Sequence, residues 1–221
     1  KETVLQHPEL IDDLIRQYSA KEAQNYDFLR DRAGEYIWFP VSRQLVSENP
    51  LELHLPQSPS VDDVLQMVLR ICEKFKSLVE NNGLCVLFYN EDGTTKHESA
   101  IQLVLYGIAD AYCHANNIMI ARESNAGRGP VDFKFGTNME NSVLVEAKKS
   151  TNTSGLKKGI EKQLPEYMDA EGSKRAIYLV VDVGFTEVAI KRLNEINKKV
   201  NGSAIDILHV NGIPKPSASR L

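Results

Sequence analysis

Cysteine is scarce in this 221-residue chain, and its pattern excludes two classes of small protein. The three cysteines, Cys72, Cys85 and Cys113, are odd in number and widely spaced. They form neither a disulfide framework nor a Cys-x-x-Cys zinc motif, so we expect buried free thiols in a reducing cytoplasm. No apolar run is long enough to cross a membrane and no secretory signal is recognisable. We therefore expect a cytoplasmic protein without membrane contact.

An excess of basic charge is missing too. The net charge of −4 argues against a highly basic nucleic-acid binder, but the charge is divided unevenly along the chain. Residues 1–98 carry 10 Lys and Arg against 17 Asp and Glu, whereas residues 99–221 carry 16 against 13. A polyanionic partner would therefore meet the second part, unless the difference is only that of an unevenly charged, solvated surface.

Hydrophobic periodicity divides the chain into a helical first part and a second part of strands and helices. In the first part we expect helices over 8–39 and 61–83, a proline-broken loop over 40–60 with a short strand at 51–55, and a strand over 84–95. In the second part we expect helices over 96–117, 155–172 and 186–202, and strands over 118–124, 130–136, 142–150, 175–184 and 204–210. This order predicts an α/β fold, with a mixed central sheet flanked by helices.

Two units follow from this division. Residues 1–90 would form a mostly helical accessory region and residues 91–221 the main domain. The chain begins with Lys1 rather than Met, so we expect a fragment or a processed form. Its partners would then include a second copy in a homodimer or other domains of a longer parent protein.

Two charged side chains occupy positions where an apolar strand should continue. Val143, Leu144 and Val145 form an apolar run within SVLVEAKKS, and Glu146 and Lys148 follow it at a spacing of two. Because side chains at i and i+2 of a strand share a face, Glu146 and Lys148 should point the same way as Leu144. For an isolated Glu-x-Lys, a simple ion pair on a solvated strand end is the plainer interpretation, whereas the apolar run before it and a matching Asp132 favour a functional site here.

The preceding strand supplies a second carboxylate. Asp132 lies on the polar face of PVDFKFG. If this strand neighbours the strand that carries Glu146, the two carboxylates converge on one point. Carboxylates are the hard oxygen ligands that Mg²⁺ or Mn²⁺ prefers, and the backbone carbonyl of Ala147 would be a further ligand. The sequence therefore predicts a divalent metal site, with Lys148 beside it as a positive charge for an anion.

These residues resemble the PD-(D/E)xK nuclease superfamily, which has the restriction-endonuclease-like fold. The resemblance covers about residues 95–210 and rests on Asp132, a gap of 13 residues and then Glu146-Ala147-Lys148. The order of elements is also similar, with a helix before the three strands and another after them.

Three residues outside the central motif extend the resemblance. Glu98 opens the preceding helix, where many members of the superfamily carry another metal-associated Glu. Gln163 and Tyr167 look like the Gln-x-x-x-Tyr signature of the RecB-like branch. An acidic residue at a helix start is also a common partner of the helix dipole, and Gln102, one turn on, either shares the site or faces solvent.

The resemblance implies metal-dependent hydrolysis of phosphodiester bonds by residues 91–221. Asp132, Glu146 and Glu98 would hold Mg²⁺ or Mn²⁺, and Lys148 would act in catalysis. DNA is the expected substrate, because the superfamily mostly cuts DNA in restriction, repair and phage defence, and an RNA-cleaving enzyme on the same fold stays open. The alternative is a catalytically inactive module on this fold, used for nucleic-acid binding or assembly.

Several polar residues are candidates for contact with the nucleic acid. Arg128 lies in a glycine-rich turn just before Asp132, where its side chain could reach a phosphate. Lys157 and Lys158 follow the Glu146 strand and could line the path of a phosphate backbone, as could Gln163 and Tyr167. An ordinary solvated side chain is the alternative interpretation of each of the five. We expect Lys149 to be a surface charge on the opposite side of the strand.

Overall fold

The computed structural model describes most of the chain from residue 35 onward. It describes residues 35–116, 118–125, 130–136, 141–151, 153–184 and 204–215, together with residues 188, 191, 193, 195 and 196. The first 34 residues of the chain, which include most of the helix expected over 8–39, lie outside the described residues.

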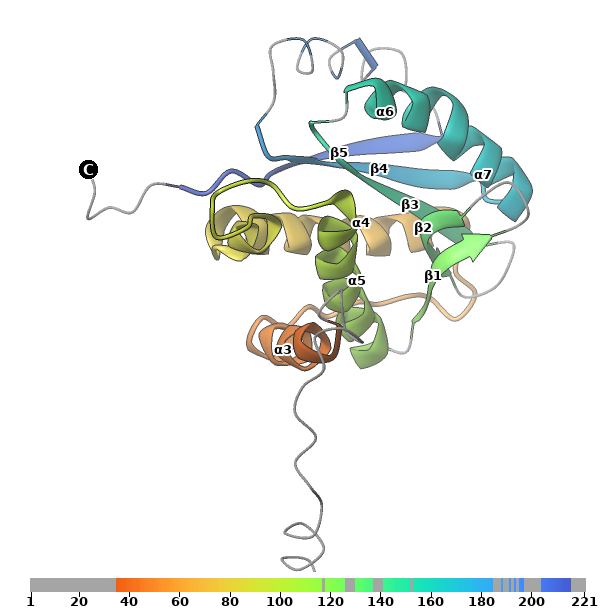
Figure 1. Cartoon of the computed structure of the whole chain (residues 1–221). Coiled ribbons are helices and arrows are strands. Elements are labelled where there is room, and N and C mark those ends of the chain that lie inside the picture. The colour runs from red at the N-terminus through yellow and green to blue at the C-terminus, as the bar shows by residue number, and fades with distance from the viewer. Residues whose placement is uncertain are drawn as a thin grey trace, which may run out of the picture. The chain divides into compact units, whose positions relative to one another are not determined.

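Five strands form one mixed sheet (Figure 1). They are β1 (Met119–Asn125), β2 (Pro130–Gly136), β3 (Ser142–Lys149), β4 (Arg175–Asp182) and β5 (Ile205–Asn211). The strands lie in chain order across the sheet. The pairs β1–β2 and β2–β3 are antiparallel, whereas β3–β4 and β4–β5 are parallel. The α/β class and the mixed sheet are therefore as the sequence predicted.

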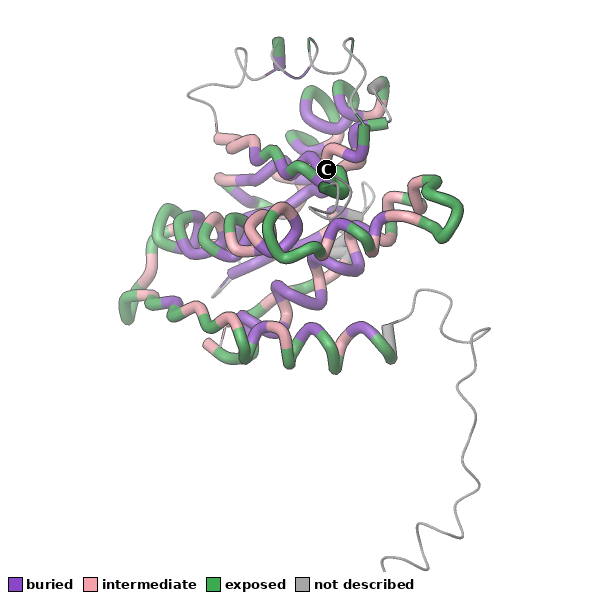
Figure 2. Tube along the Cα trace, turned by 90° about the vertical axis from the view of Figure 1, so that its left-hand side faces the viewer, coloured by how far each residue is buried: buried purple, intermediate pink, exposed green. Residues whose placement is uncertain are grey.

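One face of the sheet packs on a helical layer. Helices α4 (Val61–Asn81) and α5 (Glu98–Ala115) lie against it, and α3 (Glu35–Glu48) packs on α5 (Figure 1). Alternate strand residues such as Phe133 and Val145 join these helices in one core, and the purple segments of Figure 2 follow it. Ser60 fixes the start of α4 with a reciprocal capping box to Asp63.

The other face carries the connection between β3 and β4. It is formed by α6 (Thr153–Lys158), a π-helical turn η2 (Gly159–Gln163) and α7 (Leu164–Glu171). Leu144 and Tyr178 belong to the core on this side, together with Leu193 and Ile196 from the partly described segment before β5. Since Leu144 and Val145 belong to different cores, β3 is covered on both faces, which explains its continuous apolar run.

Two local predictions in the first part were wrong. The loop expected over 40–60 begins as helix α3, which contains Pro40 and continues to Glu48, and no strand forms at Leu51–Leu55. Burial of Trp38, Ser42 and Val46 along one stripe of α3 outweighs the cost of the proline.

The strand expected over 84–95 is likewise absent. Its first part is the 3₁₀ turn η1 (Leu84–Phe88), and only the isolated bridge between Tyr89 and Thr95 is strand-like. Cys85 and Phe88 are the buried residues of this turn, and their spacing of three places them on one side of a 3₁₀ helix.

The boundary expected at residue 90 has no counterpart in the packing. Side chains of α3 and α4 lie in the same core as those of α5 and of the sheet. The described part of the expected accessory region therefore packs together with the main domain.

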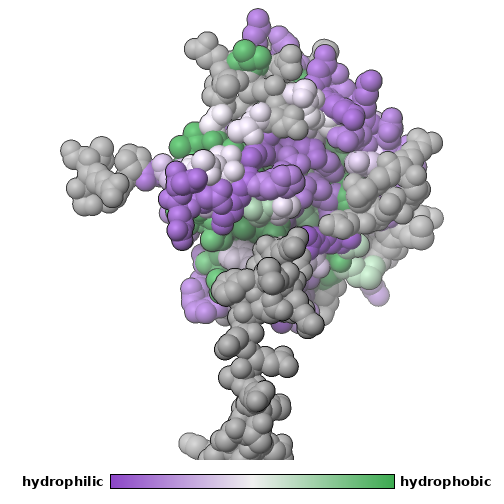
Figure 3. Space-filling model, viewed as in Figure 1, coloured by the Kyte–Doolittle hydropathy of each residue, from purple (hydrophilic) through white to green (hydrophobic). Residues whose placement is uncertain are grey.

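Part of the outer surface of the helical layer is polar. Figure 3 shows hydrophilic side chains gathered over α4 and the segment that leads to α5. None of the described helices is long and apolar enough to span a membrane.

Candidate active site

The end of β3 carries the two charged side chains that the strand pattern singled out. Glu146 and Lys148 follow Leu144 at spacings of two and belong to the face covered by α6 and α7. Glu146 is only 3% exposed, and its Oε1 lies 2.7 Å from Lys148 Nζ. Tyr178, the neighbour of Glu146 on β4, fills the space beside it. The carboxylate is therefore held inside the protein rather than on a solvated strand end.

Asp132 lies at this site because the pairing between strands β2 and β3 ends next to it. The last register pair of the two strands is Phe133 with Val145. Beyond it, Asp132 Oδ2 accepts a hydrogen bond of 2.8 Å from the Ala147 N–H, in place of a strand partner. The Asp132 N–H in turn points at Glu146 Oε2, at 3.5 Å. The two carboxylates are thus brought together, as the sequence predicted for adjacent strands.

Glu98 closes the site from the first residue of α5. Its Oε1 accepts a hydrogen bond of 3.2 Å from Lys148 Nζ, and its Oε2 accepts one of 2.9 Å from the Lys149 N–H. His97 caps the helix by accepting from the Ser99 N–H, and this fixes the direction in which α5 starts. Glu98 therefore joins the end of β3, where the resemblance placed it.

Burial and repulsion from neighbouring carboxylates raise the pKa values of Asp132 and Glu146. Burial and, after it, the charge of Glu146 raise the pKa of Asp132 to about 7, although Lys148 and the Ala147 N–H oppose the change. Burial also raises the pKa of Glu146, although Lys148 opposes the change. The pair is therefore short of positive charge when both carboxylates are ionised.

Lys148 is the ammonium group that these carboxylates share. Burial alone would lower its pKa, but the carboxylates of Glu146, Glu98 and Asp132 raise it above its usual value. Lys148 thus stays charged, and three carboxylates surround one ammonium. The buried excess of negative charge favours either a bound proton or a further cation.

The remaining predicted residues lie at different distances from this centre. Tyr167 of α7 is buried, and the burial, reinforced by the charge of Glu146, raises its pKa, which places its hydroxyl near the site. Gln163 ends η2, and Lys157 and Lys158 are exposed on α6, where Lys157 pairs with Glu161. No contact between these three predicted residues and the carboxylates is seen. Arg128 lies outside the described residues.

Two residues have roles that the sequence left open or assigned differently. Gln102, one turn after Glu98, donates from Nε2 to Asp132 Oδ1 at 2.8 Å and so shares the site. Lys149 was expected to be a surface charge, and this was wrong. Its Nζ donates to Thr95 Oγ1 and to the Lys96 carbonyl, which ties β3 to the segment before α5. The i, i+4 spacing of Glu98 and Gln102 indicated the role of Gln102, whereas no local sequence pattern indicated the role of Lys149.

A family model described as a domain of unknown function (DUF8371) matches residues 64–185. The chain belongs to this family. The matched segment runs from α4 to just beyond β4 and includes Glu98, Asp132, Glu146 and Lys148. No curated protein and no solved structure matches the chain.

The donor chemistry of the site suits a hard divalent cation. Asp132, Glu146 and Glu98 offer carboxylate oxygens, and Ala147 adds a backbone carbonyl on the same strand end, which are ligands that Mg²⁺ and Mn²⁺ prefer. As arranged here, no group of three or more His, Cys, Asp or Glu side chains within the described ranges could hold a metal ion. Lys148 stands between two of the carboxylates instead.

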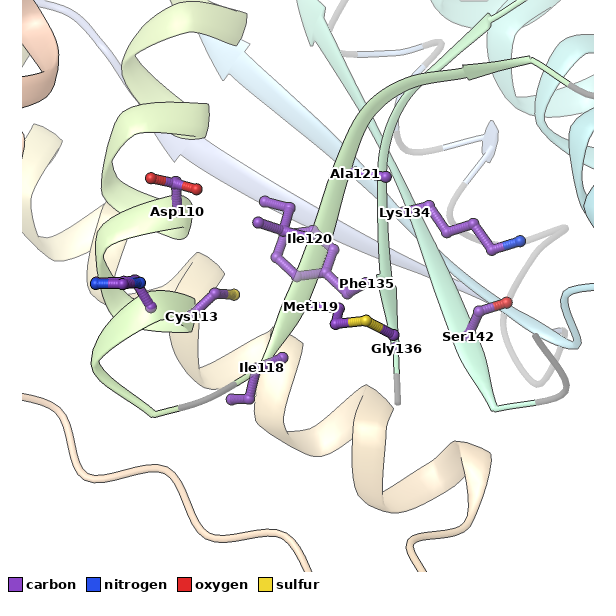
Figure 4. A pocket seen from close by; sticks show the side chains of 11 residues that line it. Asp110, Cys113, Ile118, Met119, Ile120, Ala121, Lys134, Phe135, Gly136 and Ser142 are labelled. Carbon is purple, nitrogen blue, oxygen red and sulfur yellow. The ribbon is translucent and has the colours of Figure 1, made fainter. Parts of the chain in front are cut away.

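A separate cavity lies away from the carboxylates. It has a volume of about 520 Å³ and lies between the last turns of α5 and strands β1 and β2. Figure 4 shows Cys113, Ile120 and Phe135 around it, with Asp110 at its margin and Lys134 directed to one side. None of the four charged site residues lines it, so this space is not part of the candidate active site.

Proposed function

We propose that this protein is a metal-dependent nuclease with the restriction-endonuclease-like fold of the PD-(D/E)xK superfamily. The proposal is supported most by one observation, the convergence of Asp132, Glu146, Lys148 and Glu98 from two strands and a helix on one partly buried point. DNA is the substrate favoured by the resemblance, in a role such as bacterial restriction or phage defence.

The acidic residues would provide the metal site. Asp132, Glu146 and Glu98 would hold Mg²⁺ or Mn²⁺, with the carbonyl of Ala147 as a further ligand. When bound, such an ion neutralises the charge of the phosphodiester and makes a water molecule more acidic. A second cation at this point also balances the excess of negative charge among the three carboxylates.

The other residues of the site fix the orientation of Asp132 and supply a positive charge. Gln102 and the Ala147 N–H fix both oxygens of Asp132, so this carboxylate keeps one orientation. Lys148 carries a positive charge that would attract a phosphate oxygen and stabilise negative charge that develops during cleavage. The nearby Tyr167 and the lysines of α6 would contact the nucleic acid further from the reacting bond.

Cleavage by an isosteric variant tests this function. Purified wild type should cleave plasmid DNA, single-stranded DNA or RNA with Mg²⁺ or Mn²⁺ and stop in EDTA. Asp132→Asn keeps the side-chain shape but loses the anionic ligand, so the rate should fall on the order of 10²-fold or more. Lys134→Met is the control, because Lys134 is a partly buried residue of the same strand that pairs with Glu171 outside the site.

Two results would contradict the proposed nuclease activity. Equal rates for wild type and Asp132→Asn would mean that the cleavage comes from elsewhere. If neither protein cleaves any substrate with either metal, while both bind nucleic acid equally, the catalytically inactive binding module becomes the better account.

A further inference from the structure

The ammonium of Lys148 bridges two carboxylates that come from different parts of the fold. Its Nζ lies 2.7 Å from Glu146 Oε1 on β3 and 3.2 Å from Glu98 Oε1 at the start of α5. The Lys148 side chain is 15% exposed, so water competes weakly for this position. A charged pair at such short distances and with so little solvent exposure is a strong local interaction.

No other side-chain cation from the described part of the chain reaches these two oxygens. The other four oxygens of Asp132, Glu146 and Glu98 accept from neutral amide groups, three of them backbone N–H groups and one the side-chain amide of Gln102. Among the residues that the structure describes, Lys148 alone therefore supplies a full positive charge to the cluster.

We propose that Lys148 is a resident counter-cation, which occupies the point between Glu146 and Glu98 and competes with a divalent ion for these carboxylates. The inference rests on the proposed metal site and concerns how that site opens. A divalent ion that ligates either Oε1 comes within a few ångströms of the ammonium, and the repulsion between them is several times the thermal energy even in a medium as polar as water.

This arrangement couples metal entry to release of the lysine. The ammonium must move away from at least one carboxylate when the ion enters, and it is then available to a phosphate oxygen. Without metal, Lys148 balances part of the buried negative charge and stabilises the folded site. One side chain would thus serve the metal-free protein as a counter-ion and the loaded protein as an anion contact.

Metal binding without nucleic acid tests the inference. Titration calorimetry with Mn²⁺ alone, at pH 8, should give an affinity about tenfold or more tighter for Lys148→Met and Lys148→Gln than for wild type. Lys148→Gln retains a hydrogen-bond donor, which guards against local collapse of the site. Lys148→Arg keeps the charge and should bind as wild type does. The matched control is Lys134→Met, which removes a lysine of 16% exposure from its pair with Glu171 and should leave the Mn²⁺ affinity unchanged.

The thermal midpoint gives a second measurement. In EDTA, Lys148→Met should unfold at a lower temperature than wild type, and Mn²⁺ should raise its midpoint by more than it raises that of wild type. Asp132→Asn should abolish the Mn²⁺ effect in both backgrounds, which would place the ion at this site.

The outcomes separate the two proposals. If wild type binds Mn²⁺ through Asp132 while both neutral Lys148 variants bind with equal or weaker affinity, the counter-cation role is overturned and the metal site stands. If neither wild type nor any variant binds Mn²⁺, the metal site and the counter-cation role are both overturned.

Discussion

Ionisation of Asp132 should make the metal-free protein less stable as the pH rises. The pKa of this carboxyl is raised from 3.8 to about 7, chiefly by burial. Because the folded pKa is above the unfolded one, the folded state binds the proton more tightly. The stability that this bound proton contributes is complete below pH 3.8 and is lost as the pH rises through about 7.

The size of the loss follows from the two pKa values. Each pH unit between them changes the free energy of unfolding by about 1.4 kcal/mol. Allowing for the curvature near pH 7, the stability that this proton provides should fall by about 2 kcal/mol between pH 5.5 and pH 8. Asp132→Asn lacks the titrating group and should lose none of this contribution.

Urea unfolding in EDTA at several pH values between 5.5 and 8 measures the effect. The quantity to follow is the difference in unfolding free energy between wild type and Asp132→Asn, in which the contributions of groups away from Asp132 cancel. We expect this difference to shift by about 2 kcal/mol against wild type across the range. A difference that stays constant with pH would refute the raised pKa of Asp132 and the buried charge imbalance inferred from it.

Two packing predictions accompany this one. Gly159→Ala should destabilise the fold, because a Cβ there would lie 2.5 Å from the Tyr178 hydroxyl oxygen. Tyr178→Phe should rescue part of that loss in a double-mutant cycle measured by urea unfolding, whereas strictly additive losses would contradict the contact. Trp38→Ala should cost roughly 3–5 kcal/mol of unfolding free energy, since it removes a buried ring and its 3.1 Å hydrogen bond to the Leu103 carbonyl. Ile37→Ala, on the exposed side of the same helix, is the control and should change stability by less than about 0.5 kcal/mol.

Local pattern was sufficient for the sheet and for the centre of the site. The strand period of two put Glu146 and Lys148 on one face of β3 and opposite to Val145, because pleating alone decides this alternation. The same rule pointed Asp132 toward Glu146 once the strands were taken as neighbours, and the structure pairs β2 with β3. Strand recognition worked here because the strands are apolar runs bounded by turn residues.

The first part of the chain was less predictable because its structure depends on contacts with distant residues. Pro40 normally signals the end of a helix, yet α3 continues past it, since Trp38 packs on α5 and donates to the Leu103 carbonyl. The apolar residues from Leu84 onward suit a strand equally well, but no strand within the described ranges pairs with them beyond the bridge at Tyr89.

The sequence by itself thus determined which carboxylates and which lysine share one face of β3 and of its neighbour β2. Only the tertiary structure decided how they are connected. Gln102 reaches Asp132, and Lys148 bridges Glu146 to Glu98 across 50 residues of chain, because α5 packs beside the end of β3. Hydrogen bonds and ion pairs act over a few ångströms in space, and sequence separation does not reveal which side chains come that close.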